Sequence, residues 1–87
     1  MAGGRILFFG KLSDLSGDSE WPMPEFAGTM DEGEFIELIS GGKPELSSAL
    51  KQPSVRVCVN QAIVPASERA VITSADEVAF LPPMSGG

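Results

Sequence analysis

The sequence predicts one α+β domain in which a mixed β-sheet packs against one main helix. Strand-like apolar runs occur near both ends of the chain, and a single long amphipathic helix pattern lies between them. The length of 87 residues suits one domain with one modest core, and 43% apolar against 21% charged residues is typical of a globular protein. We expect the domain to occupy residues 1–81 and an extended tail to occupy residues 82–87.

The first quarter of the chain predicts two strands joined by a short helix. Residues 6–9 form a continuous apolar run closed by Gly10, which is typical of a strand inside a sheet. Residues 12–15 combine a capping serine with two leucines three positions apart and predict a single helical turn or a short helix. A loose apolar alternation follows around Pro22 and Pro24, which remove two amide donors from one side, so this strand is expected at a sheet edge.

The middle of the chain predicts the main helix. Thr29 and Glu32 have the spacing of a capping box, and Gly41-Gly42 ends the helical pattern. Pro44 opens a second short turn that Pro53 ends. The apolar residues that gather on one face of the main helix are Phe35, Ile36, Leu38 and Ile39.

The last third of the chain predicts three further strands. Valines alternate over residues 55–59, Asn60-Gln61 is a turn candidate, and residues 62–64 form a returning strand. After an irregular stretch, Ser74-Ala75-Asp76 supplies turn chemistry before a strand over residues 77–81. The order β, turn, β, helix, β, β, β suits a mixed sheet that surrounds one helix.

Charge and hydropathy exclude two classes of partner. Twelve acidic and six basic residues give a net charge of −6, and the basic residues are scattered singly, so no nucleic-acid partner is expected. No apolar run approaches the length that spans a bilayer, and the N-terminus lacks the layout of a secretory signal. We therefore expect no membrane partner and a cytoplasmic location.

The special residues exclude several kinds of catalytic site. The sequence has no histidine and a single cysteine, Cys58, so neither a tetrahedral zinc site nor an internal disulfide is expected. Without histidine, the usual activator of a serine or cysteine nucleophile is missing. Cys58 lies within an alternating apolar run, which favours a strand residue over a nucleophile.

The C-terminal residues predict a stiff root followed by a slender tip. Pro82-Pro83 ends the last strand, because proline cannot donate to a ladder, and Met84-Ser85-Gly86-Gly87 follows. From Pro82 to Gly87 the chain could reach roughly 20 Å. Such a tail is either an idle end or a segment that enters another protein's pocket.

A terminal carboxylate without neighbouring side chains permits one particular chemistry. A carboxylate is a poor electrophile, so an activating enzyme would use ATP to convert Gly87 to an acyl-adenylate. Sulfur could then displace the nucleotide and leave a thiocarboxylate, which a partner could shield from water. No cofactor is expected on the chain itself.

The residues Ile6-Leu7-Phe8-Phe9-Gly10, Val59-Asn60-Gln61 and 76–87 resemble the small subunit of molybdopterin synthase. The resemblance implies a ubiquitin-like β-grasp fold and a Gly87 that is adenylated by an enzyme similar to ubiquitin-activating enzymes and converted to a thiocarboxylate. It implies that the tail inserts into the large subunit of a heterotetramer, where two such sulfurs convert cyclic pyranopterin monophosphate to a dithiolene. Catalytic side chains would belong to the large subunit, making this chain a non-catalytic sulfur donor. The tail residues expected to bind the partner are Leu81, Pro82, Pro83, Met84, Ser85 and Gly86.

Four alternatives share the same tail. Carriers for thiazole synthesis are usually shorter, and carriers for tRNA thiolation typically have a histidine before the glycines, where this chain has Ser85. A ubiquitin-like modifier would join Gly87 to a lysine of a target protein. In an interaction module of the same fold, the tail would be idle.

The surface that meets a partner is predicted only coarsely. Some of five apolar strand residues should form a patch on the sheet face that the helix leaves uncovered. Core packing is the alternative, particularly for the first three of them, whereas Leu81 is favoured for the interface together with Met84. Asp76 and Glu77 could guide a basic partner, although solvated turn residues are the commoner case. The five residues are Phe8, Val57, Val59, Phe80 and Leu81.

Overall fold

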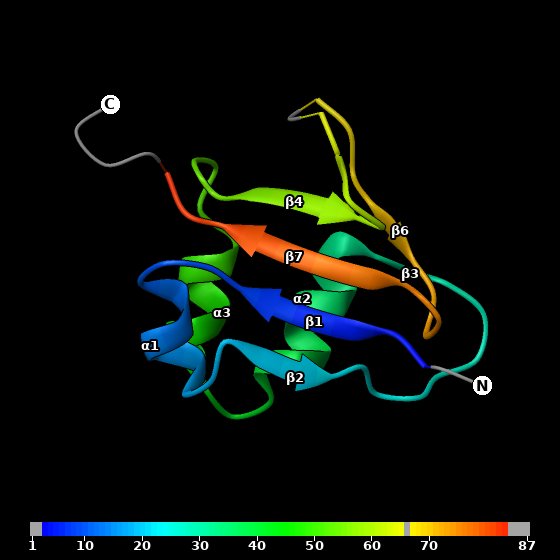
Figure 1. The fold of residues 1–87 in the computed structure, drawn as a ribbon, viewed down its shortest axis with the longest axis horizontal. Coiled ribbons are helices and arrows are strands. Elements are labelled where there is room, and N and C mark those ends of the chain that lie inside the picture. The colour runs from blue at the N-terminus through cyan, green and yellow to red at the C-terminus, as the bar shows by residue number, and fades with distance from the viewer. Residues whose placement is uncertain (1–2, 66, 84–87) are drawn as a thin grey trace.

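The centre of the fold is β7 (Glu77–Leu81), which pairs in parallel with β1 (Arg5–Phe8) and antiparallel with β4 (Arg56–Val59). The structure is a computed structural model that describes residues 3–65 and 67–83. The five-stranded sheet is completed by β2 (Glu20–Pro22) beside β1 and by β5 (Ala62–Ile63) beside β4. Its order is β2-β1-β7-β4-β5, so the sheet is mixed, as the sequence predicts (Figure 1).

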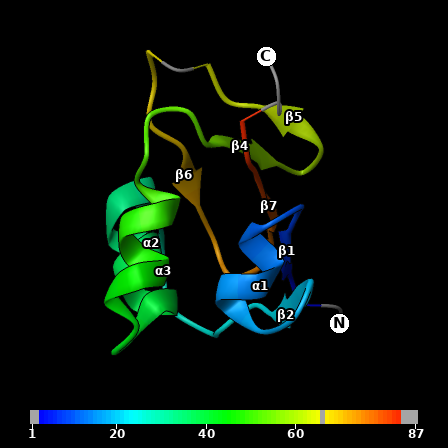
Figure 2. The same ribbon diagram turned by 90° about the vertical axis from the view of Figure 1, so that its left-hand side faces the viewer.

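Three helices lie on one side of this sheet. They are α1 (Leu12–Ser16), α2 (Glu32–Ser40) and α3 (Pro44–Leu50), and the other side of the sheet carries no helix of the described chain (Figure 2). Within residues 3–65 and 67–83, no helix is both long and apolar enough to cross a bilayer. The segment after Pro44 is thus a helix of its own rather than the short turn that the sequence suggested.

The core fills the space between the sheet and the helices. Phe80 links the two layers, because its ring stacks on Phe8 of β1 at 5.8 Å and on Phe35 of α2 at 6.5 Å between ring centroids. All three rings are nearly inaccessible to solvent, so they contribute much of the apolar burial that stabilises the fold. The residues buried around them include Ile6, Ile36, Leu46, Leu50, Val57, Ile72 and Val78.

The structure confirms that β2 is an edge strand. The backbone N–H of Met23 donates to the carbonyl of Gly4 at 3.2 Å, so odd-numbered residues of this segment direct their backbone groups toward β1. Pro22 therefore faces the outer edge, where its missing N–H costs no ladder bond. This proline leaves an edge that offers little to an incoming strand.

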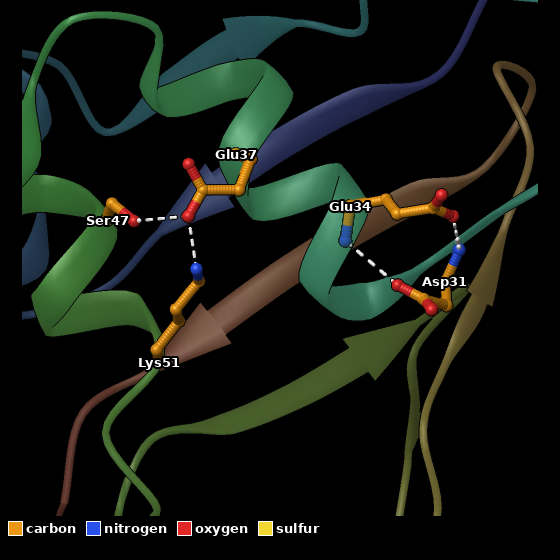
Figure 3. Close-up of polar contacts among 5 residues, drawn as sticks. All are labelled: Asp31, Glu34, Glu37, Ser47 and Lys51. Atoms are coloured by element: carbon orange, nitrogen blue, oxygen red, sulfur yellow. Dashed lines mark hydrogen bonds and ion pairs between the residues drawn. The ribbon is translucent and has the colours of Figure 1, made fainter.

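The main helix begins two residues later than the sequence suggested. The capping box joins Asp31 and Glu34, not Thr29 and Glu32: the Glu34 N–H donates to Asp31 Oδ1 at 2.8 Å, and the Asp31 N–H donates to Glu34 Oε1 at 3.2 Å (Figure 3). The reason is a second, two-stranded sheet formed by β3 (Met30–Asp31) and β6 (Val71–Ile72). Pairing with β6 holds residue 30 extended, so the helix cannot begin before Glu32.

A polar contact joins α2 to α3. Glu37 accepts a hydrogen bond from Ser47 Oγ at 3.1 Å and forms an ion pair with Lys51 (Figure 3). The pKa of the Glu37 carboxyl is lowered, mainly by the hydrogen bond from Lys51 and to a smaller extent by the hydrogen bond from Ser47. This contact is exposed to solvent, so we assign most of the helix pairing to the buried leucines of α3.

Candidate functional site

The predicted tail begins at the end of the central strand. Leu81 is the last residue of β7 and Pro82 follows it, both half-buried, whereas Pro83 is exposed. Met84, Ser85, Gly86 and Gly87 lie outside the described residues, so their roles and the domain boundary at residue 81 stay predictions. Figure 1 shows that β7 and β1 end on the same side of the sheet, at the place where β4 begins. The root of the tail, which continues β7, thus lies between the end of β1 and the start of β4.

A glycine makes room for this root. Gly10 follows β1 with a φ of +56°, and a Cβ added to it would lie 2.9 Å from Cγ of Pro82. Both the backbone conformation and the close approach favour glycine here. The sequence showed Gly10 only as the end of an apolar run, because a contact with a residue 72 positions away leaves no local signal. Gly10 was therefore missed as a residue that positions the tail.

The sheet face opposite the helices carries an apolar patch beside the root. Strand register places Leu7, Ala79, Cys58 and Ile63 side by side across four strands on this face. Phe9 is 46% exposed and Ile63 is 61% exposed, so both present apolar surface to solvent. With Leu81, these residues form what we call the open-face patch, whose members are Leu7, Phe9, Cys58, Ile63, Ala79 and Leu81.

The structure decides between surface and core for the five strand residues considered from sequence. Phe8, Val57 and Phe80 belong to the core, and Val59 also packs against it. Of the five residues proposed from sequence, only Leu81 lies on the open face. Sequence alternation identified the strands but not which parity points to the helices, so Leu7, Phe9 and Ile63 were missed.

Asp76 links the turn before β7 to neighbouring segments through its carboxylate. Its carboxylate accepts hydrogen bonds from the Thr73 N–H at 2.8 Å and from Asn60 Nδ2 at 3.0 Å, while Asn60 Oδ1 accepts the Glu77 N–H at 3.0 Å. Partial burial is the largest single influence and opposes ionisation, but the Thr73 and Asn60 hydrogen bonds together outweigh it and lower the pKa of Asp76. Asn60, with φ +52° in the predicted Asn60-Gln61 turn, thereby joins this turn to the start of β7.

Charged residues on the open face are separated along the strands. Arg5 pairs with Glu20 and Glu77, each at 3.6 Å, at the end of the face that lies away from the root.

Cys58 is half-buried in the patch and has no second cysteine to pair with. The described residues contain no group of three His, Cys, Asp or Glu side chains that could hold a metal ion.

Comparisons with known proteins agree with this geometry. A family model described as the ThiS family matches residues 6–87. Two curated proteins, both described as molybdopterin synthase sulfur carrier subunit, are 29% identical to this chain over 83 residues. The one from Chlamydomonas reinhardtii is covered over 96% of its length and the one from Mycobacterium tuberculosis over 95%, in each case by 95% of this chain.

The fold is also known from solved structures. The crystal structure of small archaeal modifier protein 1 (SAMP1) from Haloferax volcanii superposes with a TM-score of 0.73 at 22% identity, covering 99% of this chain and 100% of that one. At this identity the likeness concerns the fold. It confirms the ubiquitin-like β-grasp that the sequence resemblance implied.

Proposed function

Because the chain belongs to the ThiS family, we propose that it is a sulfur carrier that holds sulfur as a thiocarboxylate on Gly87. We further propose that it acts as the small subunit of molybdopterin synthase and delivers this sulfur to cyclic pyranopterin monophosphate. The two curated relatives that carry this subunit's name support the assignment. The observation that carries it is the position of the tail root, which leaves the central strand beside the open-face patch.

Loading the carrier takes two steps that another enzyme performs. The Gly87 carboxylate attacks the α-phosphorus of ATP, which forms an acyl-adenylate and releases pyrophosphate. A sulfur nucleophile then attacks the acyl carbon and expels AMP, which leaves a thiocarboxylate. The enzyme that supplies this chemistry would be an adenylyltransferase similar to ubiquitin-activating enzymes. The described residues of the chain offer no histidine and no metal-binding cluster for the task.

The open-face patch is the docking surface in this proposal. A partner that covers Phe9, Leu81 and Ile63 would gain burial of apolar area at roughly 25 cal/mol per Å². The same partner would lie next to Pro82 and Pro83. Both the activating enzyme and the large subunit would use this face, so their binding would be mutually exclusive.

Reconstitution with the large subunit tests the pathway assignment. The chain bearing a thiocarboxylate, the large subunit and cyclic pyranopterin monophosphate should yield the dithiolene product, with two carriers consumed for each product. A chain that lacks Gly86-Gly87 should yield none. If thiocarboxylate forms but no dithiolene appears, the sulfur belongs to another acceptor, and thiazole synthesis or tRNA thiolation takes precedence. Conjugates between Gly87 and lysines of other proteins would favour a modifier.

A further inference from the structure

Two of the six basic residues, Lys11 and Arg56, flank the tail root. Arg69 is also exposed and forms no ion pair with a described residue, but it lies beside Gly33 of α2 and not at the root. Arg5 and Lys51 form ion pairs with carboxylates. Lys43 lies over the Trp21 ring at 5.6 Å. Lys11 and Arg56 are both exposed, and neither forms an ion pair with a described residue. In a chain of net charge −6, these two cations are a local reversal of sign.

The fold brings Lys11 and Arg56 to the root from opposite sides. Arg56 is the ladder partner of Leu81 in the β4–β7 pairing, so their Cα atoms lie about 5 Å apart. Lys11 follows Gly10, whose missing Cβ leaves the space that Pro82 occupies. Asp14, one turn along α1, forms no ion pair with Lys11 within the described chain. The open-face carboxylates Glu20 and Glu77 both pair with Arg5, which leaves a net charge of −1 for this group.

We propose that Lys11 and Arg56 form a cationic collar that pairs with carboxylate side chains at the entrance of the pocket that receives the tail. The inference rests on the proposed function, because the occupant is the large subunit of the synthase. The distance between the collar and the end of the tail argues against an action of the collar on the Gly87 carboxylate itself. A tail extended into a partner would place the Gly87 carboxylate roughly 20 Å from Pro82. The Debye length is only about 8–10 Å, so the collar acts on groups at the entrance rather than on the reacting end.

The collar would orient the partner on the open-face patch. Apolar contact alone is compatible with several orientations, whereas the two cations at the root and the net negative group of Arg5, Glu20 and Glu77 give the face a direction. Rim charges of this kind act mainly on the association rate, and salt weakens their effect. The collar thus raises the rate at which the partner associates in the orientation that places its pocket at the tail.

Charge reversal with a matched control tests the collar. We would measure binding of the full chain to the large subunit for wild type, Lys11→Glu, Arg56→Glu, the double variant and Lys43→Glu. Lys43→Glu makes the same change of charge in the α2–α3 loop on the helix side. The double variant should bind about tenfold more weakly at about 50 mM salt, chiefly through slower association, and this difference should fade at about 500 mM. Lys43→Glu should bind within about twofold of wild type.

A second measurement keeps the test independent of any loss of folding. Thermal melts of all variants should agree with wild type, since both collar side chains are exposed. Carbodiimide coupling of the wild-type complex should join Lys11 to a carboxylate of the large subunit, which peptide mapping would locate. Equal binding by wild type and the double variant, or a loss that salt leaves unchanged, would overturn the collar. If the wild-type chain does not bind the large subunit, the proposed function fails first, and the occupant named here fails with it.

Discussion

Replacing Gly10 by alanine should destabilise the chain through two separable effects. At φ +56° an alanine carries the left-handed penalty of about 1–2 kcal/mol. Its Cβ would also meet Pro82 Cγ at 2.9 Å, and overpacking of that kind costs about 1–3 kcal/mol. We therefore expect a loss of about 2–5 kcal/mol in the free energy of unfolding, measured by urea denaturation.

Gly28 provides the matched control for the backbone effect. Its φ is +72°, and nothing lies within 4 Å of a Cβ built on it, so Gly28→Ala should show the penalty of about 1–2 kcal/mol alone. Pro82→Ala removes the atoms that Gly10→Ala would strike. In the double variant Gly10→Ala/Pro82→Ala, part of the loss should therefore be recovered, with a coupling of about 0.5–3 kcal/mol.

The cycle has a clear negative outcome. Equal losses for Gly10→Ala and Gly28→Ala, with no coupling between Gly10 and Pro82, would show that the tail root is not held against the β1–α1 turn. Positioning of the root by Gly10 would then be wrong, although the carrier chemistry would be untouched. A coupling accompanied by slower sulfur delivery in Gly10→Ala would link the contact to function.

Other changes give equally specific expectations. Gly4→Ala should cost at least about 3 kcal/mol and could prevent folding, because its Cβ would lie 1.9 Å from the backbone oxygen of Asp76; a melting temperature close to wild type would contradict this packing. Since the folded pKa of Asp76 is lowered, its carboxylate stabilises the fold above the unfolded pKa of about 3.9, and this contribution is lost as the pH falls through the folded pKa. The stability difference between wild type and Asp76→Ala in urea titrations should therefore shrink in acid, whereas a difference independent of pH would refute the network. Phe9→Ser and Ile63→Ser should weaken binding of the large subunit with little change in stability, and Leu38→Ser, exposed on the helix side, should not; equal effects of all three would dismiss the open-face patch.

Local signals predicted most of the fold. Pro22 and Pro24 identified the edge strand, Asn60-Gln61 the hairpin turn, and Pro82-Pro83 the end of the last strand, because each depends on the backbone chemistry of a few adjacent residues. The strands β3 and β6 were not predicted. Each has two residues, too few for a period of two to appear, and each exists only because the other is present.

The parts of the site that were missed depend on distant contacts. Gly10 and Gly4 are special because of Pro82 and Asp76, which the chain reaches only at its far end. The open-face patch depends on which parity of each strand points toward α2, and a sequence of alternating valines looks the same either way. Lys11 and Arg56 appeared as scattered single charges, since only the pairing of β7 with both β1 and β4 brings them to one place.

The most direct test of the carrier proposal is an intact-protein mass spectrum of the chain after incubation with ATP, a sulfide source and an activating enzyme similar to ubiquitin-activating enzymes. We expect a mass gain equal to the exchange of one oxygen for one sulfur in the wild-type chain, and no gain in a chain that lacks Gly86-Gly87. An unchanged mass, while the same enzyme activates a known carrier in a parallel reaction, would contradict the proposal that Gly87 carries sulfur.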